Sequence, residues 1–190
     1  MSHTYQLKIE LVGSNPTIWR KLTVPGNTFF DDLHDIIQML MGWKNEYPFE
    51  FNINKIRVRD FGVEFDTGGD PNDRDVMDTA LDELVTMVKA KFTYIYSAYE
   101  RRELQITLEE ILHSHEAPDR PVCIGGERAC PADSLTQAIA PEDVASFKIE
   151  EVNANLRRYA EEWEKIDDET GKIIHRLENK DDDGEDDGRE

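Results

Sequence analysis

Residues 5–43 read YQLKIELVGSNPTIWRKLTVPGNTFFDDLHDIIQMLMGW. Apolar and polar side chains alternate over residues 5–11, and this period of two is typical of a strand with one buried face. The polar segment 13–16 predicts a turn. A second strand is expected over residues 18–24, because the apolar pattern resumes there and the Pro-Gly pair at 25–26 stops it. The two strands are expected to form an antiparallel hairpin.

A helix is expected directly after this hairpin. Thr28 and Asp31 have the spacing of a capping box, which predicts a helix N-terminus, and Gly42 suits the position just after a helix C-terminus. A hairpin followed by a helix that packs on it is typical of α+β domains. Between the two ends, five apolar residues recur at helical spacing and form one face: Leu33, Ile36, Ile37, Leu40 and Met41.

In the middle of the chain, apolar and polar side chains again alternate with a period of two. Residues 66–78 are rich in Asp and contain glycines and a proline, which predicts an ordinary solvated acidic loop. A short helix is expected to begin near Thr79, and residues 118–131 are expected to be irregular. The alternating patterns predict strands at residues 49–53, 56–58, 63–65, 92–96 and 104–108.

Two further helical patterns follow. Pro141, before two acidic residues, predicts a helix N-terminus, and this helix is expected to continue through Phe147. An apolar stripe predicts an amphipathic helix over about residues 150–168, which we expect either to pack back onto the domain or to fill a groove in a partner. The stripe consists of Tyr159, Trp163 and Ile166.

These patterns predict an α+β fold. Its sheet is expected to be mixed or antiparallel, built on the N-terminal hairpin and the helix packed on it. One domain is expected at residues 4–150, followed by a C-terminal amphipathic helix within 151–177. Residues 178–190 are expected to be a disordered acidic tail.

The chain is strongly acidic. Its 190 residues include 41 Asp and Glu against 22 Lys and Arg, a net charge of −19. The tail from Glu178 onward accounts for −6 and the remainder for −13. Because binding to DNA or RNA is driven by neutralisation of phosphates, this charge argues against nucleic acid and anionic membranes as direct partners. There is no long apolar segment and no signal peptide, and two cysteines are too few for a disulfide framework, so a cytoplasmic protein is expected.

Seven stretches, taken together and in order, resemble a known family. They are YQLKI at 5–9, PTIWR at 16–20, VPG at 24–26, LHDIIQ at 33–38, MGW at 41–43, FTYIY at 92–96 and CIGGERACP at 123–131. This series is similar to the Ri-plasmid open-reading-frame-three-like family, whose members also carry the label of insertion-element passenger proteins of TnpR type. The resemblance implies an α+β fold, a cytoplasmic setting and a loose tie to mobile elements. Most members have no assigned activity, and the resemblance does not imply recombinase chemistry.

The sequence departs from the family pattern in one segment. After the Tyr-x-Tyr strand the family usually has Y-D-F-G-D-x-W-x-H, whereas residues 96–104 read YSAYERREL. The Asp, Gly, Trp and His of the pattern are therefore missing. The family's A-C-P-P-E-D is kept only in part, as ACPAD at 129–133. Whatever the family does with its acidic turn and histidine, this chain is expected to do differently or not at all.

One cluster of residue types could ligate a metal: His113, His115, Cys123 and Cys130. Two imidazoles and two thiolates are an ordinary zinc set, and four protein ligands would make a structural site. The spacing argues against zinc, because zinc-binding cysteines usually stand two to four residues apart. The alternative is two cysteines in a turn, buried as small apolar groups, beside exposed histidines.

No nucleotide-binding or hydrolase motif occurs in the sequence. The leading hypothesis is a non-enzymatic interaction module whose acidic surface suits a basic protein partner. The alternatives are a zinc protein, structural or hydrolytic, that uses the four residues above, and a DNA accessory protein of mobile elements. His34, within the first helix, is expected to be structural or on the surface. The sequence leaves the oligomeric state open.

Overall fold

The computed structural model describes residues 3–62, 70–97, 101–113, 118–131 and 147–163. Eight strands form one sheet, and two longer helices and one short helix accompany it. In chain order the elements are β1 (Thr4–Leu11), β2 (Trp19–Pro25), α1 (Phe30–Met41), β3 (Phe49–Ile53), β4 (Ile56–Arg59), β5 (Arg74–Asp75), α2 (Leu81–Leu84), β6 (Lys91–Tyr96), β7 (Arg102–Leu112), β8 (Val122–Glu127) and α3 (Ile149–Trp163).

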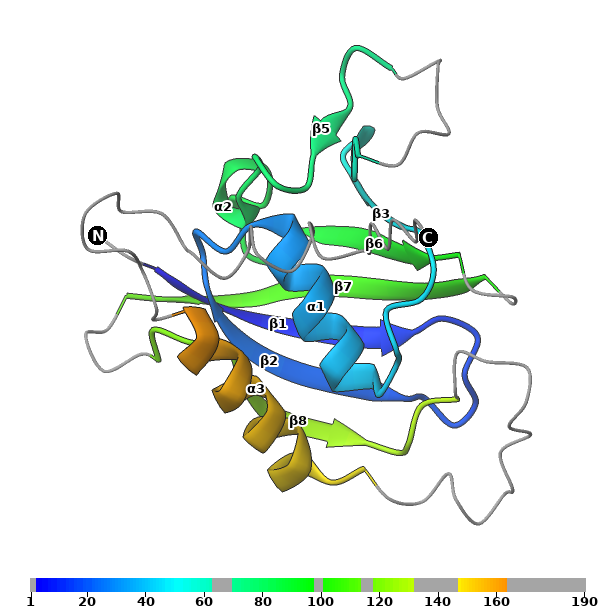
Figure 1. Ribbon diagram of the computed structural model, residues 1–190, viewed down its shortest axis with the longest axis vertical. Coiled ribbons are helices and arrows are strands. Elements are labelled where there is room, and N and C mark those ends of the chain that lie inside the picture. The colour runs from blue at the N-terminus through cyan, green and yellow to red at the C-terminus, as the bar shows by residue number, and fades with distance from the viewer. Residues whose placement is uncertain (1–2, 63–69, 98–100, 114–117, 132–146, 164–190) are drawn as a thin grey trace, which may run out of the picture.

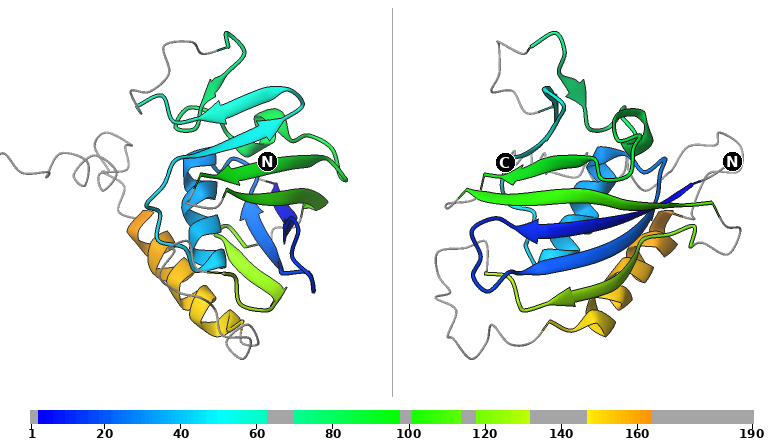
Figure 2. Two further views of the ribbon diagram at one scale, coloured as in Figure 1. Left: turned by 90° about the vertical axis from the view of Figure 1, so that its right-hand side faces the viewer. Right: turned by 180° about the vertical axis from the view of Figure 1, so that it is seen from behind.

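The strand order in the sheet is β5-β4-β3-β6-β7-β1-β2-β8. All neighbours are antiparallel except β4 and β5, which are parallel, so the sheet is mixed. Helices α1 and α3 lie on one face of the sheet (Figure 1). The views from the side and from behind show that none of the described helices lies on the opposite face of the central strands (Figure 2). The α+β class predicted from the sequence is confirmed.

The core lies between α1 and the sheet. Leu7, Ile9, Leu22, Ile36 and Ile37 are fully buried there. The hairpin predicted at residues 5–24 is present as β1 and β2, in a register that pairs Leu7 with Leu22. The apolar helical face of residues 33–41 packs on this hairpin and on β6 and β7, so the N-terminal segment forms the centre of the fold as expected.

The start of α1 differs from the prediction. The helix is capped by Phe29, not by Thr28, whose hydroxyl donates to the Pro25 carbonyl at 2.7 Å. The carboxylate of Asp32, and not that of Asp31, accepts a hydrogen bond from the Phe29 backbone N–H. The predicted capping box is therefore absent, because the Phe29 side chain cannot accept a hydrogen bond, and only the bond from the Phe29 N–H to Asp32 is formed. At the other end the prediction is confirmed, because Gly42 adopts the left-handed conformation with φ of 73°.

Residues 118–131 are not irregular, and this prediction was wrong. They contain β8, which pairs with β2 at one edge of the sheet. The pattern was hidden because Gly125 and Gly126 interrupt the apolar alternation. A Cβ at Gly126 would lie 2.7 Å from the Phe147 ring and 2.9 Å from Arg20 Cδ, so close packing requires glycine at this position.

The C-terminal helix α3 packs against β8 and α1. It begins at Ile149, and Phe147 precedes it, so the prediction of helix through Phe147 was wrong. Leu156 and Ala160 of α3 are buried. The predicted strand 63–65, the helix start at Pro141, the residue Ile166 and the tail 178–190 lie outside the described residues. Within the described part of the chain, no helix has the length and apolar character needed to cross a membrane.

Candidate functional site

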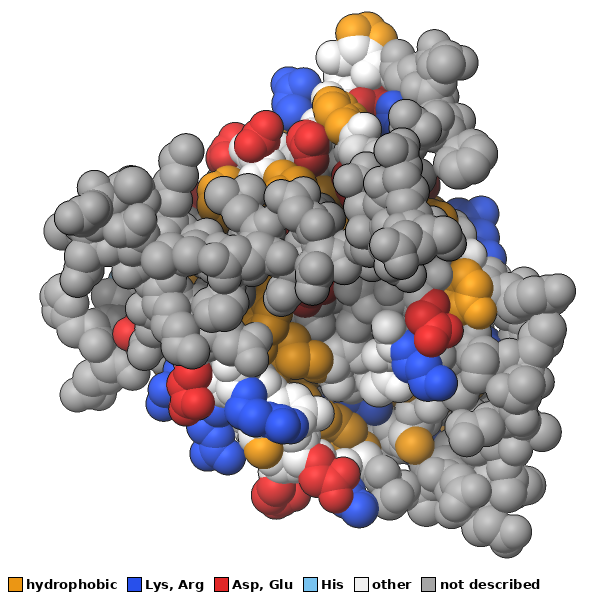
Figure 3. Space-filling view, viewed as in Figure 1, with side chains coloured by type: hydrophobic (Ala, Val, Ile, Leu, Met, Phe, Trp, Pro, Cys, Tyr) orange, Lys and Arg blue, Asp and Glu red, His pale blue; other side chains and the backbone are white. Residues whose placement is uncertain are grey.

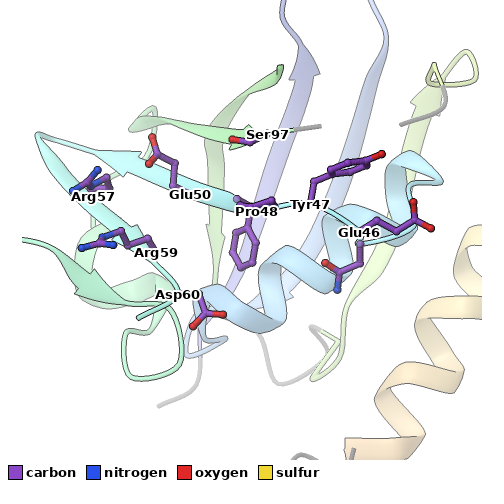
Figure 4. A pocket seen from close by; sticks show the side chains of 10 residues that line it. Glu46, Tyr47, Pro48, Glu50, Arg57, Arg59, Asp60 and Ser97 are labelled. Atoms are coloured by element: carbon purple, nitrogen blue, oxygen red, sulfur yellow. The ribbon is translucent and has the colours of Figure 1, made fainter. Parts of the chain in front are cut away.

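An open groove of about 480 Å³ lies where the loop between α1 and β3 meets the β3–β4 hairpin. Arg57, Arg59 and Glu50 project from the hairpin at one end of the groove (Figure 4). Glu46 and Tyr47 stand on the loop at the other end. The volume is within the range of sites that hold a small ligand or a few side chains. The full lining is Asn45, Glu46, Tyr47, Pro48, Phe49, Glu50, Arg57, Arg59, Asp60 and Ser97.

The two arginines of the groove are held by one carboxylate. Asp73 accepts hydrogen bonds from Arg57 Nη2 at 2.7 Å and from Arg59 Nε at 3.0 Å. Its side chain is only 4 % exposed. The bonds from Arg57 and Arg59 lower the pKa of Asp73 against the opposing effect of burial. The prediction of an ordinary solvated acidic loop was thus wrong for Asp73, whose charge compensates the arginines.

The acidic side chains of the groove are not compensated in this way. Asp60 accepts a hydrogen bond from the Gly62 backbone N–H at 2.7 Å, and Glu50 accepts one from Asn52 Nδ2 at 3.0 Å. Within the described residues, neither of these carboxylates nor that of Glu46 forms an ion pair. With Asp73 included, the four carboxylates outnumber the two arginines, so the net charge of the groove is negative.

Aromatic rings support the groove from beneath. The Phe49 ring stacks on the His34 imidazole, with centroids 3.5 Å apart and an angle of 4° between planes. Tyr47 meets Tyr96 edge to face at 5.8 Å. These contacts join the lining residues to the core, so the groove has an apolar floor that is fixed by packing.

A chain of polar side chains fixes the loop that carries Asn45. Gln38 Nε2 donates to Tyr94 Oη at 2.8 Å, and the Asn45 backbone N–H donates to Gln38 Oε1 at 3.0 Å. Asn45 Nδ2 donates to Asp35 Oδ1 at 3.1 Å, which leaves Asn45 Oδ1 as an acceptor facing His34 Nε2. The imidazole therefore carries its proton on Nε2, and Nδ1 accepts from the Tyr94 hydroxyl at 2.8 Å.

His34 belongs to this structural network and is 2 % exposed. Burial, opposed by the bond with Asn45, lowers the pKa of His34 to about 4, so the ring is neutral at physiological pH. Of the two alternatives predicted for His34, the structural role is confirmed and the surface position is not. No proton acceptor beyond the network partners reaches the ring among the described residues.

Helix α1 carries a second perturbed group, Asp32. Its carboxyl is 9 % exposed and lies near Asp35. Burial first, and then the charge of Asp35, raise the pKa of Asp32 to about 7. Tyr159 of α3 donates its hydroxyl to Asp35 Oδ2 at 3.1 Å and also bonds to Asp32. The stripe predicted from Tyr159 onward therefore packs back onto the domain at Tyr159, while the side chain of Trp163 lies outside the described residues.

The four predicted metal ligands lie in different surroundings. Cys123 is a buried thiol on β8 that donates to the Gly125 carbonyl at 3.4 Å. Burial raises its pKa, which disfavours the thiolate that a metal requires. Cys130 is partly buried, and His115 lies outside the described residues. His113 faces another histidine, His3, at 2.9 Å between Nδ1 atoms. Among the described residues, no three His, Cys, Asp or Glu side chains are grouped to hold a metal.

Comparison with known proteins places this fold in a family. The sequence profile described as plasmid pRiA4b ORF-3-like protein matches residues 3–169. The chain belongs to this family. The match includes every element from β1 to α3 and every residue of the groove, and it confirms the resemblance seen in the sequence.

Two known proteins are similar to this chain. An uncharacterised protein, y4hQ, from Sinorhizobium fredii (strain NBRC 101917 / NGR234) is 29 % identical over 133 residues, which are 68 % of this chain. The match covers 65 % of the relative's own length. A protein of unknown function from Methanosarcina mazei Go1, MM3350, has a similar crystal structure, with a TM-score of 0.66 and 23 % identity. That match covers 80 % of this chain and 97 % of the other, and it supports the fold alone.

This family member departs from the family pattern beside the groove. Ser97, which lines the groove, stands where the pattern has an Asp. Leu104, which is fully buried on β7, stands where the pattern has a His. The acidic character of the groove rim in this chain comes from Glu46, Glu50 and Asp60.

Proposed function

We propose that this protein is a cytoplasmic, non-enzymatic interaction module that binds a basic segment of a protein partner in the groove. The observation that carries the proposal is the charge of the lining. The positive charges of Arg57 and Arg59 are engaged by the buried Asp73. The carboxylates of the groove have no such cation among the described residues. A ligand with Lys or Arg side chains would supply it.

The shape and chemistry of the floor fit such a side chain. Lys and Arg carry a long apolar stem with a charged end, and they bind well where an aromatic surface adjoins a carboxylate. Phe49 and Tyr47 provide the aromatic surface, and Asp60 and Glu46 provide the carboxylates. The charge of −19 for the whole chain would attract a basic partner from a distance and repel nucleic acid.

Acidic and basic side chains are unevenly distributed on the helix-bearing face. Asp and Glu side chains gather near α2, whereas over α3 Lys and Arg side chains are interspersed with Asp and Glu (Figure 3). The groove lies at the opposite end of the sheet from β8, against which α3 packs. The proposal places the basic segment at the groove, where carboxylates adjoin aromatic rings, and not along α3, where Arg157 and Arg158 stand among the glutamates.

The proposal is tested with a fluorescently labelled nonapeptide of alternating Lys and Gly at physiological salt, measured by anisotropy. The double variant Glu46→Gln/Asp60→Asn removes two groove charges, and Glu110→Gln/Glu150→Gln removes two exposed charges elsewhere. We expect the groove variant to raise Kd at least tenfold, about 1.4 kcal/mol, and the control to change it less than twofold. An equal loss in both variants would show non-specific attraction and contradict the proposal.

A further inference from the structure

Two histidines that are far apart in the sequence meet at one end of the central strands. β1 and β7 are antiparallel, and Thr4 pairs with Leu112. His3, just before β1, therefore lies opposite His113, just after β7. Their Nδ1 atoms are 2.9 Å apart, and the ring planes are nearly perpendicular, at 88°. The His3 backbone is itself fixed, because its carbonyl accepts a hydrogen bond from the Gly26 N–H at 2.7 Å.

The short distance between the two Nδ1 atoms requires a proton between them. Two imidazole nitrogens at hydrogen-bond distance can approach only if one of them carries a proton toward the other's lone pair. In the described part of the chain, neither ring makes another hydrogen bond. His113 is exposed, so its ring is open to solvent ions. A metal ion that replaces the shared proton would gain two nitrogen ligands at once.

The spacing of the two nitrogens favours some metals over others. With metal–nitrogen bonds of about 2.0–2.1 Å, two ligands at 90° have nitrogens about 2.9 Å apart, whereas tetrahedral ligands have nitrogens about 3.3 Å apart. The observed separation is 2.9 Å. Right-angled coordination is typical of square-planar or octahedral Cu²⁺ and Ni²⁺, and tetrahedral coordination is typical of Zn²⁺.

We propose that His3 and His113 form a two-imidazole site for Cu²⁺ or Ni²⁺ on the protein surface. Water completes the coordination. The site differs from the zinc set considered from the sequence, because the partner of His113 is a histidine on the neighbouring strand and not a cysteine. It is independent of the groove and of any peptide that binds there.

The test is a Cu²⁺ titration of the full-length protein, purified without a histidine tag. A short extension before Met1 keeps the terminal amine away from His3, since a free amine there would itself bind copper. We expect one equivalent of Cu²⁺ to bind, with an electron paramagnetic resonance spectrum that shows two coupled nitrogens. His3→Asn and His113→Asn should each raise Kd at least tenfold, and His175→Asn should change it less than twofold.

His113→Asn is the decisive variant, because its residue lies far from the N-terminus in the sequence. Copper affinity within twofold of the wild type in this variant would overturn the proposal, as would a spectrum without nitrogen coupling. A parallel titration with Ni²⁺ and Zn²⁺ tests the geometry. Ni²⁺ is expected to bind at least as tightly as Zn²⁺, and Zn²⁺ binding ten times more tightly than Ni²⁺ would contradict right-angled coordination. Circular dichroism melting shows that each variant is folded.

Discussion

Arg20 is a charged residue in the core, and its role follows from the hydrogen bonds that its guanidinium donates. Its guanidinium donates to the carbonyls of Leu40 at 2.9 Å, Trp19 at 2.7 Å, Glu127 at 3.0 Å and Arg128 at 2.8 Å. The side chain is 2 % exposed and stacks on Phe147 at 3.9 Å. One side chain therefore joins the end of α1, the end of β8 and the segment before α3.

Replacement of Arg20 by Met tests this role. The apolar stem is kept, but several buried carbonyls lose their donor, and each costs about 1–3 kcal/mol. We expect the free energy of unfolding to fall by about 3 kcal/mol or more, measured by urea denaturation. Lys21→Met, at the next position on β2, should cost about 0.5 kcal/mol or less. A loss of less than about 1 kcal/mol for Arg20→Met would show that water replaces the guanidinium.

Asp32 makes the stability of the folded protein depend on pH. Its pKa is about 7 in the folded protein and about 3.9 in an unfolded chain. The folded protein therefore binds the proton more tightly, and the stability that this confers is complete below about pH 4 and is lost as pH rises to about 7. His34 acts in the opposite direction. Its pKa is about 4 in the folded protein, so its contribution makes the protein less stable as pH falls below about 6.5.

Asp32→Asn isolates the first effect, because the contribution of His34 is common to both proteins and cancels in the difference. The amide keeps an oxygen for the Phe29 N–H and cannot ionise. We expect the stability of the variant relative to the wild type to increase by about 2–4 kcal/mol between pH 4 and pH 8, measured by denaturation at several pH values. Parallel stability curves for the two proteins would contradict the assignment.

At the scale of the elements, α3 protects an edge of the sheet. Asn153 accepts from the Cys123 N–H and donates to the Cys123 carbonyl, both at 2.8 Å. One side-chain amide thus satisfies the backbone groups that β8 would otherwise expose to another strand.

Asn153→Ala removes both of these bonds. We expect a loss of about 1–3 kcal/mol in stability and faster hydrogen exchange at the Cys123 amide, measured by NMR. Asn155→Ala is the matched control, because Asn155 is exposed on the same helix and bonds only to Arg158 among the described residues. Unchanged exchange at Cys123 in the Asn153 variant would show that this bond does not hold α3 on the sheet.

Most of the elements could be predicted from the sequence, because long periodic segments depend on one physical property, the burial of a face. The hairpin, α1, β3, β6 and β7 are of this kind. β8 was missed because two glycines interrupt its pattern, and Gly126 is required there by the close packing of Arg20 and Phe147, which the sequence does not reveal. Arg20 did give a signal, since it shares the alternating face of Ile18, Leu22 and Val24, but a charge on that face was not taken as buried.

The groove depends on contacts between distant segments, and the sequence contains little sign of it. Asp73 reaches Arg57 and Arg59 only because β5 lies beside β4. Asn45 lines the groove because the loop between α1 and β3 passes one end of it. For the same reason His113, which was considered with two cysteines, is found beside His3. Residue types could be recognised from the sequence, but the pairs that they form could not.

At the scale of the whole molecule, the structure shows where part of the acidic charge lies. The net charge of −19 alone predicts only repulsion of nucleic acid and attraction of basic partners. The structure adds a groove in which two arginines share the buried Asp73, whereas Glu46, Glu50 and Asp60 form no ion pair among the described residues, so the net charge there is negative. Salt is expected to weaken peptide binding at this groove, because the attraction is between charges that are partly exposed to solvent.

The most direct test of the central claim is the place at which a basic peptide binds. Backbone NMR spectra of the ¹⁵N-labelled protein, recorded with increasing Lys-Gly nonapeptide, report each amide separately. The proposal predicts shifts that saturate and are concentrated at residues 45–50, 57–60 and 97, and that are absent in Glu46→Gln/Asp60→Asn. Shifts spread evenly over the acidic surface, or concentrated on α3, would contradict it.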